Sequence, residues 1–303
     1  MKFNLAEVIR VLLVSTENIF LYNKMKITVL AENSVCKSNS LNLKAENGLS
    51  LFIEFDERKI LFDTGQSDLD IHNVGEMGID LSQVDYLIIS HGHFDHGGGL
   101  KHFQKINKKA RVFFHIDAVK KYYTRIFGFI PYYVGLDQKI LAQNSRIYFI
   151  DEDTQIEDKI ILLEGFAEVF TQPEYDKTLL EKTENRFIAD NFNHELAMLL
   201  IENDEIVLFS GCSHSGIINN IDEVKLFSKN MRIKATFGGL HFHNPISKKN
   251  ESPEYIADLT IALGETEAVF YTGHCSGENN MWYIKGGMPG KIQIMNTGDV
   301  FEI

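Results

Sequence analysis

The chain carries the same hairpin pattern twice, 147 residues apart. Residues 49–55 and 59–65 are apolar stretches around a short polar turn, and residues 196–202 and 205–211 repeat this arrangement. Two apolar runs joined by a few polar residues are typical of a β-hairpin. A unit repeated at so long a distance predicts two related halves that pack together. It does not predict a solenoid, whose repeats are roughly 20–50 residues long.

Stretches typical of helices and strands alternate after each hairpin. This alternation predicts α/β layers around two sheets. The expected elements are a helix near 69–78 and a strand at 84–90 in the first half, and helices at 215–230 and 253–263 with buried strands at 233–237 and 267–271 in the second.

Two segments depart from this pattern. Residues 117–193 contain a run of aromatic residues and an acidic segment, and we expect them to be partly strand and partly an inserted lid. Residues 1–24 precede the first clear strand, which begins at Met25. They are either an amphipathic helix or sequence upstream of a natural start at Met25. We expect one domain over residues 25–303, with the insertion around 117–193 and an N-terminal extension at 1–24.

The composition narrows the class of protein. With 44% hydrophobic and 24% charged residues, the 303-residue chain has the make-up of a folded globular protein. Its net charge of -12 has the wrong sign for binding a nucleic-acid backbone. No apolar run approaches the ~20 residues of a membrane span, and Arg10 interrupts the only stretch that resembles a secretory signal. Three scattered cysteines favour a reducing compartment, so we expect a cytoplasmic protein.

Four potential metal ligands follow the strand at 84–90 within six residues: His91, His93, Asp95 and His96. Imidazole nitrogens suit zinc. The surrounding glycines form an open loop in which successive side chains can turn toward one centre. Packing of a hydrophobic core does not require three histidines and an aspartate at this spacing. The sequence therefore predicts a metal site at the end of this strand.

The His-x-His-x-Asp-His pattern after a strand resembles the signature of the metallo-β-lactamase superfamily, and residues 61–65 match the early strand and turn of that superfamily. The resemblance covers residues 25–303. It implies an αββα sandwich of two mixed β-sheets flanked by helices, whose halves are related by a pseudo-repeat. Residues 48–51, 90–100, 210–217 and 272–277 together resemble a subgroup named 7,8-dihydropterin-6-methyl-4-(β-D-ribofuranosyl)aminobenzene-5'-phosphate synthase, which implies a pterin-transfer reaction.

The resemblance also implies roles for single residues. His91 and His93 would bind the first of two metal ions, and Asp95 and His96 the second. His274, in a glycine-flanked turn after a strand, matches the last ligand position on the second metal.

The position that usually holds a bridging aspartate is occupied by Cys212, with His214 two residues later. We expect His214 to complete the first metal site. Cys212 either bridges the metals as a thiolate or lines the site, and an inert buried thiol is a further alternative. His194 is a weaker candidate ligand.

Further candidates concern the substrate and the support of the ligands. Gly239 lets a backbone approach a ligand closely, and the resemblance places His241 at the mouth of the site, where it could bond to a phosphate or carboxylate oxygen. Tyr132 could stack on a flat ring, or simply belong to the core. Asp63 is expected to orient a ligand histidine, with turn capping as the alternative. His72, His102 and His115 are interpreted as surface or structural residues.

The predicted function is that of a dinuclear-metal-dependent hydrolase or transferase acting on a small phosphorylated or anionic substrate. The expected cofactors are two divalent metal ions, with zinc foremost and manganese or iron as alternatives. Asp95 would serve as ligand and proton acceptor, and His241 would assist on the substrate side. The alternatives are a phosphodiesterase or lactonase, and a non-catalytic sensor module with the same fold. We expect no nucleic-acid or membrane partner, and a homo-oligomer is compatible with the sequence.

Overall fold

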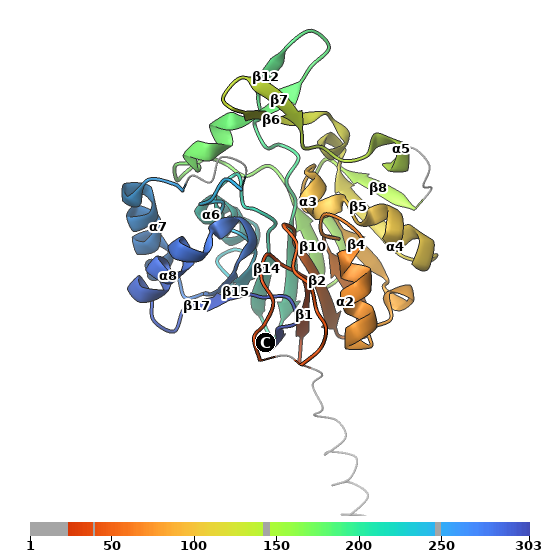
Figure 1. Cartoon of the computed structure of the whole chain (residues 1–303). Helices are drawn as coiled ribbons and strands as arrows, with labels where there is room; N and C mark the ends of the chain where they lie inside the picture. Colours follow the sequence, from red (N-terminus) through yellow and green to blue (C-terminus); the bar gives the residue numbers. More distant parts are fainter. Residues whose placement is uncertain (1–23, 39, 142–145, 246–249) are drawn as a thin grey trace, which may run out of the picture.

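Two β-sheets lie face to face, and helices cover the outer face of each sheet (Figure 1). The computed structural model describes residues 24–38, 40–141, 146–245 and 250–303. The predicted αββα sandwich of two mixed sheets is confirmed.

The first sheet orders its seven described strands as β18-β1-β2-β3-β4-β5-β8. Strands β1 to β3 pair antiparallel, whereas β3, β4, β5 and β8 run parallel. Helices α2 and α4 pack on its outer face through Val74 and Phe103. The bounds are β1 Lys26–Ala31, β2 Ser50–Phe55, β3 Arg58–Phe62, α2 Leu69–Met77, β4 Tyr86–Ile88, α4 Leu100–Ile106, β5 Arg111–His115, β8 Ile147–Ile150 and β18 Val300–Glu302.

The second sheet has the order β17-β16-β15-β14-β13-β10-β9. Strands β14 to β17 run parallel, and β13 pairs antiparallel with both β10 and β14. Helices α6, α7 and α8 cover its outer face. The bounds are β9 Thr154–Glu157, β10 Ile160–Leu163, β13 Ala197–Glu202, β14 Glu205–Phe209, α6 Ile217–Phe227, β15 Arg232–Phe237, α7 Pro253–Glu265, β16 Val269–Thr272, α8 Glu278–Gly287 and β17 Ile292–Ile294.

The duplicated hairpin is confirmed down to its register. Leu51 pairs with Phe62 in the first hairpin, and Met198 pairs with Phe209 in the second, both at the offset of 147. In each half, the second strand of the hairpin pairs in parallel with the next strand of its sheet, β3 with β4 and β14 with β15. The two sheets are therefore built on the same plan.

The inner faces of the sheets meet in an apolar core. Ile53 and Phe62 contribute from the first sheet, and Leu200 and Phe209 from the second. The rings of Phe62 and Phe209 lie 5.9 Å apart. Since each sheet is covered on both faces, its central strands are apolar on both sides and do not alternate with polar residues. Each fully buried large apolar side chain stabilises the fold by roughly 1.5–3 kcal/mol.

Residues 117–193 divide between the sandwich and a third sheet. Strands β8, β9 and β10 complete the edges of the two main sheets. The third sheet has the order β12-β11-β6-β7 and lies across one end of the sandwich (Figure 1). Its strands are β6 Tyr122–Ile126, β7 Ile130–Tyr133, β11 Leu179–Lys182 and β12 Phe187–Ala189. We call this sheet the cap.

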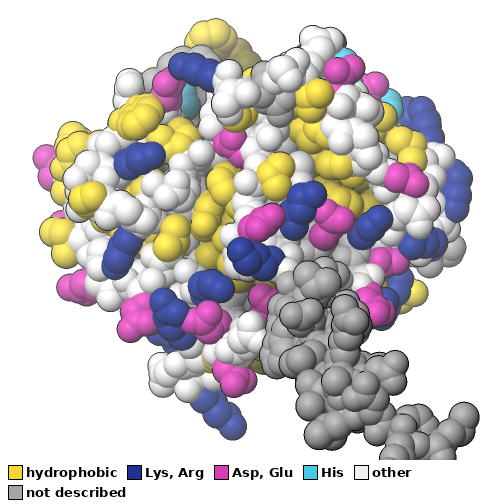
Figure 2. Space-filling view, turned by 90° about the horizontal axis from the view of Figure 1, so that it is seen from below, with side chains coloured by type: hydrophobic (Ala, Val, Ile, Leu, Met, Phe, Trp, Pro, Cys, Tyr) yellow, Lys and Arg dark blue, Asp and Glu magenta, His cyan; other side chains and the backbone are white. Residues whose placement is uncertain are grey.

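The extension predicted at residues 1–24 lies, apart from Lys24, outside the described residues. Among the described residues, no helix has the length and apolar character needed to cross a membrane. On the face opposite the cap, Lys and Arg side chains of the described residues intermingle with Asp and Glu side chains (Figure 2).

Candidate metal centre

The predicted ligands lie in turns that follow parallel strands of both sheets. The turn after β4 carries His91 and His93, the turn after β14 carries Cys212 and His214, and His274 follows β16. The loops at the carboxyl ends of parallel strands are where ligands bind in open α/β sheets. Because the two sheets face each other, their turns meet at the end of the sandwich beneath the cap.

The first cluster consists of His91, His93 and His214. One nitrogen from each ring lies within 4.8 Å of the others. The Nε2 atoms of all three are buried and have no hydrogen-bond partner. Burying an unpaired polar atom is costly, and a cation held by the three lone pairs would remove this cost. Burial, together with the neighbouring histidines, lowers the pKa of His91 and of His214 well below the ordinary value and that of His93 to about 3. The rings are therefore neutral, as metal ligation requires.

The second cluster consists of Asp95, His96 and His274. Nε2 of His274 lies 3.5 Å from Oδ2 of Asp95 and 3.2 Å from Nε2 of His96. Burial opposes ionisation of Asp95, but the hydrogen bond from His274 and the nearby imidazoles hold the pKa of this carboxyl below its ordinary value. A carboxylate and two imidazoles form a mixed O/N donor set that suits zinc, manganese or iron.

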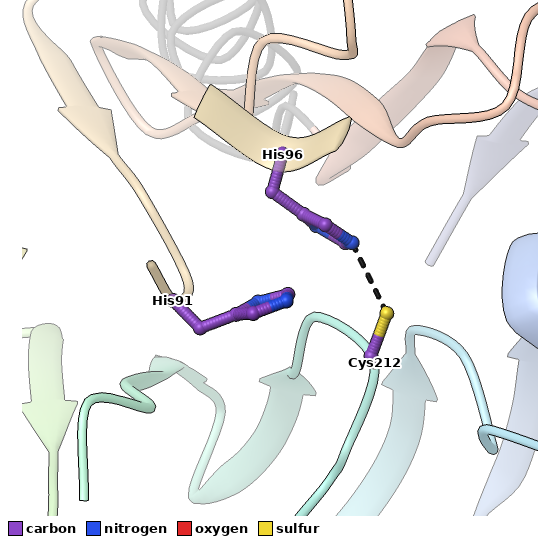
Figure 3. A group of neighbouring side chains, drawn as sticks. All are labelled: His91, His96 and Cys212. Atoms are coloured by element: carbon purple, nitrogen blue, oxygen red, sulfur yellow. Dashed lines mark hydrogen bonds between the residues drawn. The ribbon is translucent and has the colours of Figure 1, made fainter. Parts of the chain in front are cut away.

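Cys212 lies between the two clusters. Its sulfur is 3.1 Å from Nε2 of His96 and also groups with His91. Figure 3 shows the three side chains pointing toward one another from opposite sides of the site, with His96 on the short helix α3 (Phe94–Gly97) and Cys212 on the loop after β14. The structure thus puts Cys212 where the predicted bridge would lie.

Carboxylates behind the histidines fix their ring orientation. Asp63, predicted for this role, lies 2.6 Å from Nδ1 of His96 and also accepts hydrogen bonds from Ser90. Asp176, which was not predicted from the sequence, has the same role for His214, because its Oδ1 lies 2.6 Å from Nδ1 of that ring. Such carboxylate–imidazole contacts leave Nε2 free for a metal. Asp176 lies in a short 3₁₀ helix of the 117–193 segment, Glu174–Thr178, where no motif marks it.

His194 is a neighbour of the first cluster whose two ring nitrogens are both engaged. Its Nδ1 accepts the backbone N–H of Gly92 at 2.9 Å, and its Nε2 lies 3.1 Å from Asp190. Asp190 also lies 4.0 Å from Nε2 of His93. These contacts suit a supporting residue. Asp190 was a further residue without a sequence signal.

The loop after β1 supports the second cluster and was not predicted. Glu32 accepts the backbone N–H of His274, and Oδ1 of Asn33 lies 3.1 Å from Nδ1 of His274. The side-chain amide of Asn47 donates a hydrogen bond from Nδ2 to Oδ2 of Asp95 at 3.5 Å. Although burial opposes it, the contact with Asp95 and the nearby Cys275 and Glu32 raise the pKa of His274 to about 9.

Four non-glycine residues of the site have left-handed backbones. These are Asp63 (φ 61°), Ser213 (φ 55°), His241 (φ 48°) and His274 (φ 49°). This conformation costs a residue with a side chain roughly 1–2 kcal/mol. Each of the four lies in a turn directly after a strand of the main sheets. The packing of these sheets keeps the four residues in a strained backbone conformation, at the turns that carry the candidate site residues.

A cavity of about 730 Å³ opens onto both clusters. Tyr132 and His241, both predicted to contact the substrate, line it, whereas Gly239 does not. A Cβ at position 239 would overlap the sulfur of Cys275, so this glycine makes room for a cysteine side chain. Burial lowers the pKa of His241, but Asp176 outweighs this effect and raises it to about 9.

The histidines predicted to be surface or structural residues have partners outside the two clusters. His72 contacts the carbonyl of Asn42 at 2.9 Å, His102 lies 3.8 Å from Asp68, and His115 lies 3.6 Å from Glu164.

Comparison with known proteins identifies the family to which the fold belongs. The Lactamase_B family, described as metallo-beta-lactamase superfamily, matches residues 43–178. An uncharacterized protein of Methanocaldococcus jannaschii, MJ0448, is 32% identical over 219 residues, which cover 71% of this chain and 78% of that protein. The 7,8-dihydropterin-6-methyl-4-(beta-D-ribofuranosyl)-aminobenzene-5'-phosphate synthase of the same organism is 28% identical over 275 residues, covering 86% of this chain and 90% of the synthase.

A solved structure shares the whole fold. The crystal structure of Tm1679, titled a metal-dependent hydrolase of the beta-lactamase superfamily, superposes with a TM-score of 0.77 at 27% identity. The match covers 92% of this chain and 99% of that protein. With the paired sheets and the histidine turns, these likenesses show that this chain belongs to the metallo-β-lactamase superfamily.

Proposed function

We propose that this chain is a hydrolase or transferase that uses two divalent metal ions. The observation that carries the proposal is the set of three buried Nε2 atoms, on His91, His93 and His214, that converge without hydrogen-bond partners. The cluster of Asp95, His96 and His274 would hold the second ion, with Cys212 between the two.

The donor set fits zinc best, with manganese or iron as alternatives. Two such ions, when bound, lower the pKa of a bridging water toward ~7 and stabilise the charge that develops on the substrate. Asp95 lines the cavity and would accept the proton that the attacking water gives up. Asp63 and Asp176 would keep the imidazoles in the tautomer that presents Nε2 to the ions.

The cavity lining supports a substrate with an apolar body and a negatively charged group. Ile126, Tyr132 and Leu179 of the cap form an apolar wall, and Asn33 and Gln66 offer amide groups on the other side. No lysine or arginine appears among the described residues of the lining. An anionic group would therefore be bound at the metal centre.

The synthase named above supports a substrate that carries a flat ring and a phosphate, and Tyr132 is placed to contact such a ring. In a transfer reaction of that kind, an aromatic carbon or nitrogen of one substrate would displace a diphosphate from the other. The metal centre would bind the diphosphate leaving group, and the cap would hold the ring. We propose a cytoplasmic location, which the three free cysteines support.

Metal analysis by mass spectrometry tests the proposal. Wild-type protein should carry at least two ions per chain, and His91→Ala, His96→Ala and His274→Ala should each carry fewer. His102→Ala is the matched control, because His102 is a half-buried histidine on α4 away from the cavity. Unchanged metal content in all three site variants would refute the site.

A panel of phosphodiesters, lactones and phosphorylated pterin-like compounds then identifies the reaction. Metal-dependent turnover of one class identifies the enzyme as a phosphodiesterase, a lactonase or a transferase. Binding of a panel member with no turnover of any would instead favour a sensor module.

A further inference from the structure

A second group of potential ligands adjoins the two clusters. The sulfurs of Cys212 and Cys275 and a ring nitrogen of His241 lie within 4.8 Å of one another. All three residues are less than one-tenth exposed. Cys275 and His241 belong to neither cluster of the two-metal centre, and only Cys212 is shared with it.

We propose that Cys212, Cys275 and His241 form a third metal site, for zinc or another borderline-soft divalent ion. Two thiolates and an imidazole are the ligands of Cys₂His zinc sites. All three residues also line the cavity, so an ion bound here has access to solvent and an open position for a further ligand.

The fold brings these residues together through three neighbouring strands. Cys212, His241 and Cys275 follow β14, β15 and β16, which pair in parallel in that order. Their turns therefore lie side by side at one edge of the second sheet. The backbone amide of Gly239, two residues before His241, donates to the carbonyl of Gly211, just before Cys212, at 2.7 Å. This hydrogen bond fixes the spacing of two of the turns.

Gly239 makes room for the sulfur of Cys275. A Cβ on residue 239 would overlap that sulfur, and it would also lie 3.6 Å from the Cα of Cys212. The absence of a side chain here therefore lets the two cysteines approach each other. The glycine predicted for close approach to a ligand instead allows two candidate ligands to meet.

The imidazole of His241 has the arrangement of a metal ligand. Asp176 lies 3.3 Å from its Nε2, while its Nδ1 is buried and has no hydrogen-bond partner. A carboxylate on one ring nitrogen and a second nitrogen without a hydrogen-bond partner are typical of ligating histidines. A bound cation would displace the proton that Asp176 favours on this ring. Because Asp176 also contacts His214, one carboxylate would support both the first cluster and the third site.

The third site changes how the substrate would be recognised. With an ion bound, the metal and not the His241 ring would contact an anionic group in the cavity. This inference does not depend on which reaction the two-metal centre catalyses.

Cobalt reconstitution tests the third site. We would saturate three metal-free proteins with Co²⁺, namely wild type, Cys275→Ser and Cys36→Ser, and then remove the excess metal. Two quantities are measured: the number of bound cobalt ions per chain, and the near-ultraviolet absorption of thiolate-to-cobalt charge transfer. Cys36 is the matched control, since its thiol contacts Ser38 at 3.0 Å and does not line the cavity. We expect three ions in wild type and Cys36→Ser, and two ions with weaker absorption in Cys275→Ser.

Two ions in wild type, or three in Cys275→Ser, would overturn the third site. Two ions in wild type, with less bound metal in His91→Ala, would contradict the third site but agree with the two-metal proposal. The two proposals can therefore be refuted independently. If Cys275→Ser does not fold, the wild type is saturated with cadmium and the third site is tested by cadmium NMR. A resonance in the range of two-sulfur coordination supports the site, and its absence from the saturated protein overturns it.

Discussion

Oδ1 of Asp176 lies 2.6 Å from Nδ1 of His214, and both side chains are buried. The neutral imidazole donates its Nδ1–H to the carboxylate, which leaves the Nε2 lone pair directed at the first cluster. A residue from the irregular 117–193 segment therefore sets the tautomer of a ligand on the second sheet.

Replacing Asp176 by Asn should weaken metal binding at the first cluster. The amide keeps the size of the side chain. Burial raises the pKa of Asp176 well above its ordinary value, and a cation bound at His214 would favour the charged carboxylate, a form that the amide cannot adopt. We expect the affinity of the first cluster for its ion to fall by about 10–100-fold, measured by competition with a chromophoric chelator. Asp222→Asn on the exposed side of α6 is the control and should bind as wild type does. Equal affinities in both variants would contradict the role of Asp176.

Removing the metal should destabilise the fold. Ions that bind only the folded chain add about 2.7 kcal/mol at a free concentration 100 times their Kd. We expect a strong chelator to lower the free energy of unfolding of wild type and His102→Ala by about 3 kcal/mol or more, with recovery on adding zinc. His91→Ala should respond less. A denaturation midpoint of the wild type that is the same with and without the chelator would contradict the proposed metal centre.

Gly239→Ala should destabilise the protein, because the new Cβ would overlap the sulfur of Cys275. Overpacking of this kind costs about 1–3 kcal/mol. Gly264→Ala provides the contrast, since a Cβ at this position in helix α7 meets no atom within 4 Å. That variant should gain about 0.5–1 kcal/mol. Urea unfolding of both measures the difference, and equal stabilities would show that Cys275 is placed elsewhere.

Asp70 should make stability depend on pH. Burial raises the pKa of its carboxyl from the ordinary 3.8 to about 8 in the folded chain. The folded state therefore holds a proton that the unfolded state releases. Its stabilising contribution is complete below pH 3.8, declines as pH rises, and is lost above about pH 8. The decline is at most about 1.4 kcal/mol per pH unit.

Asp70→Asn removes this titration. The stability of the variant relative to wild type should therefore increase steadily between about pH 5 and pH 8. Urea unfolding at several pH values measures this difference, in which the other titrating groups cancel. A difference that stays constant with pH would show that Asp70 is ionised in the folded chain.

The hairpins and the histidine turns could be predicted because their signals are local. Apolar runs around a polar turn specify residues 49–65, and the repeat at 196–211 shows that the fold has two halves. The proposed ligands His91, His93, Asp95 and His96 stand within six residues, so this group of potential metal ligands can be recognised without a structure.

The supporting residues could not be predicted, because they come from distant parts of the chain. Asp176 and Asp190 have no motif, and their contacts with histidines depend on how the 117–193 segment folds over the sheets. The same segment also supplies β8, β9 and β10 to the main sheets, a division that its weak periodicity does not reveal.

The sequence by itself determined the architecture and the main cluster of potential metal ligands, since hydrophobic pattern, hairpin turns and closely spaced histidines act over short distances along the chain. Only the tertiary structure decided which residues meet at the site. Cys212 reaches His96, and Cys275 fits against Gly239, because parallel strands and facing sheets bring separate turns to one edge. Contacts of this kind depend on packing across the whole domain, which no local pattern encodes.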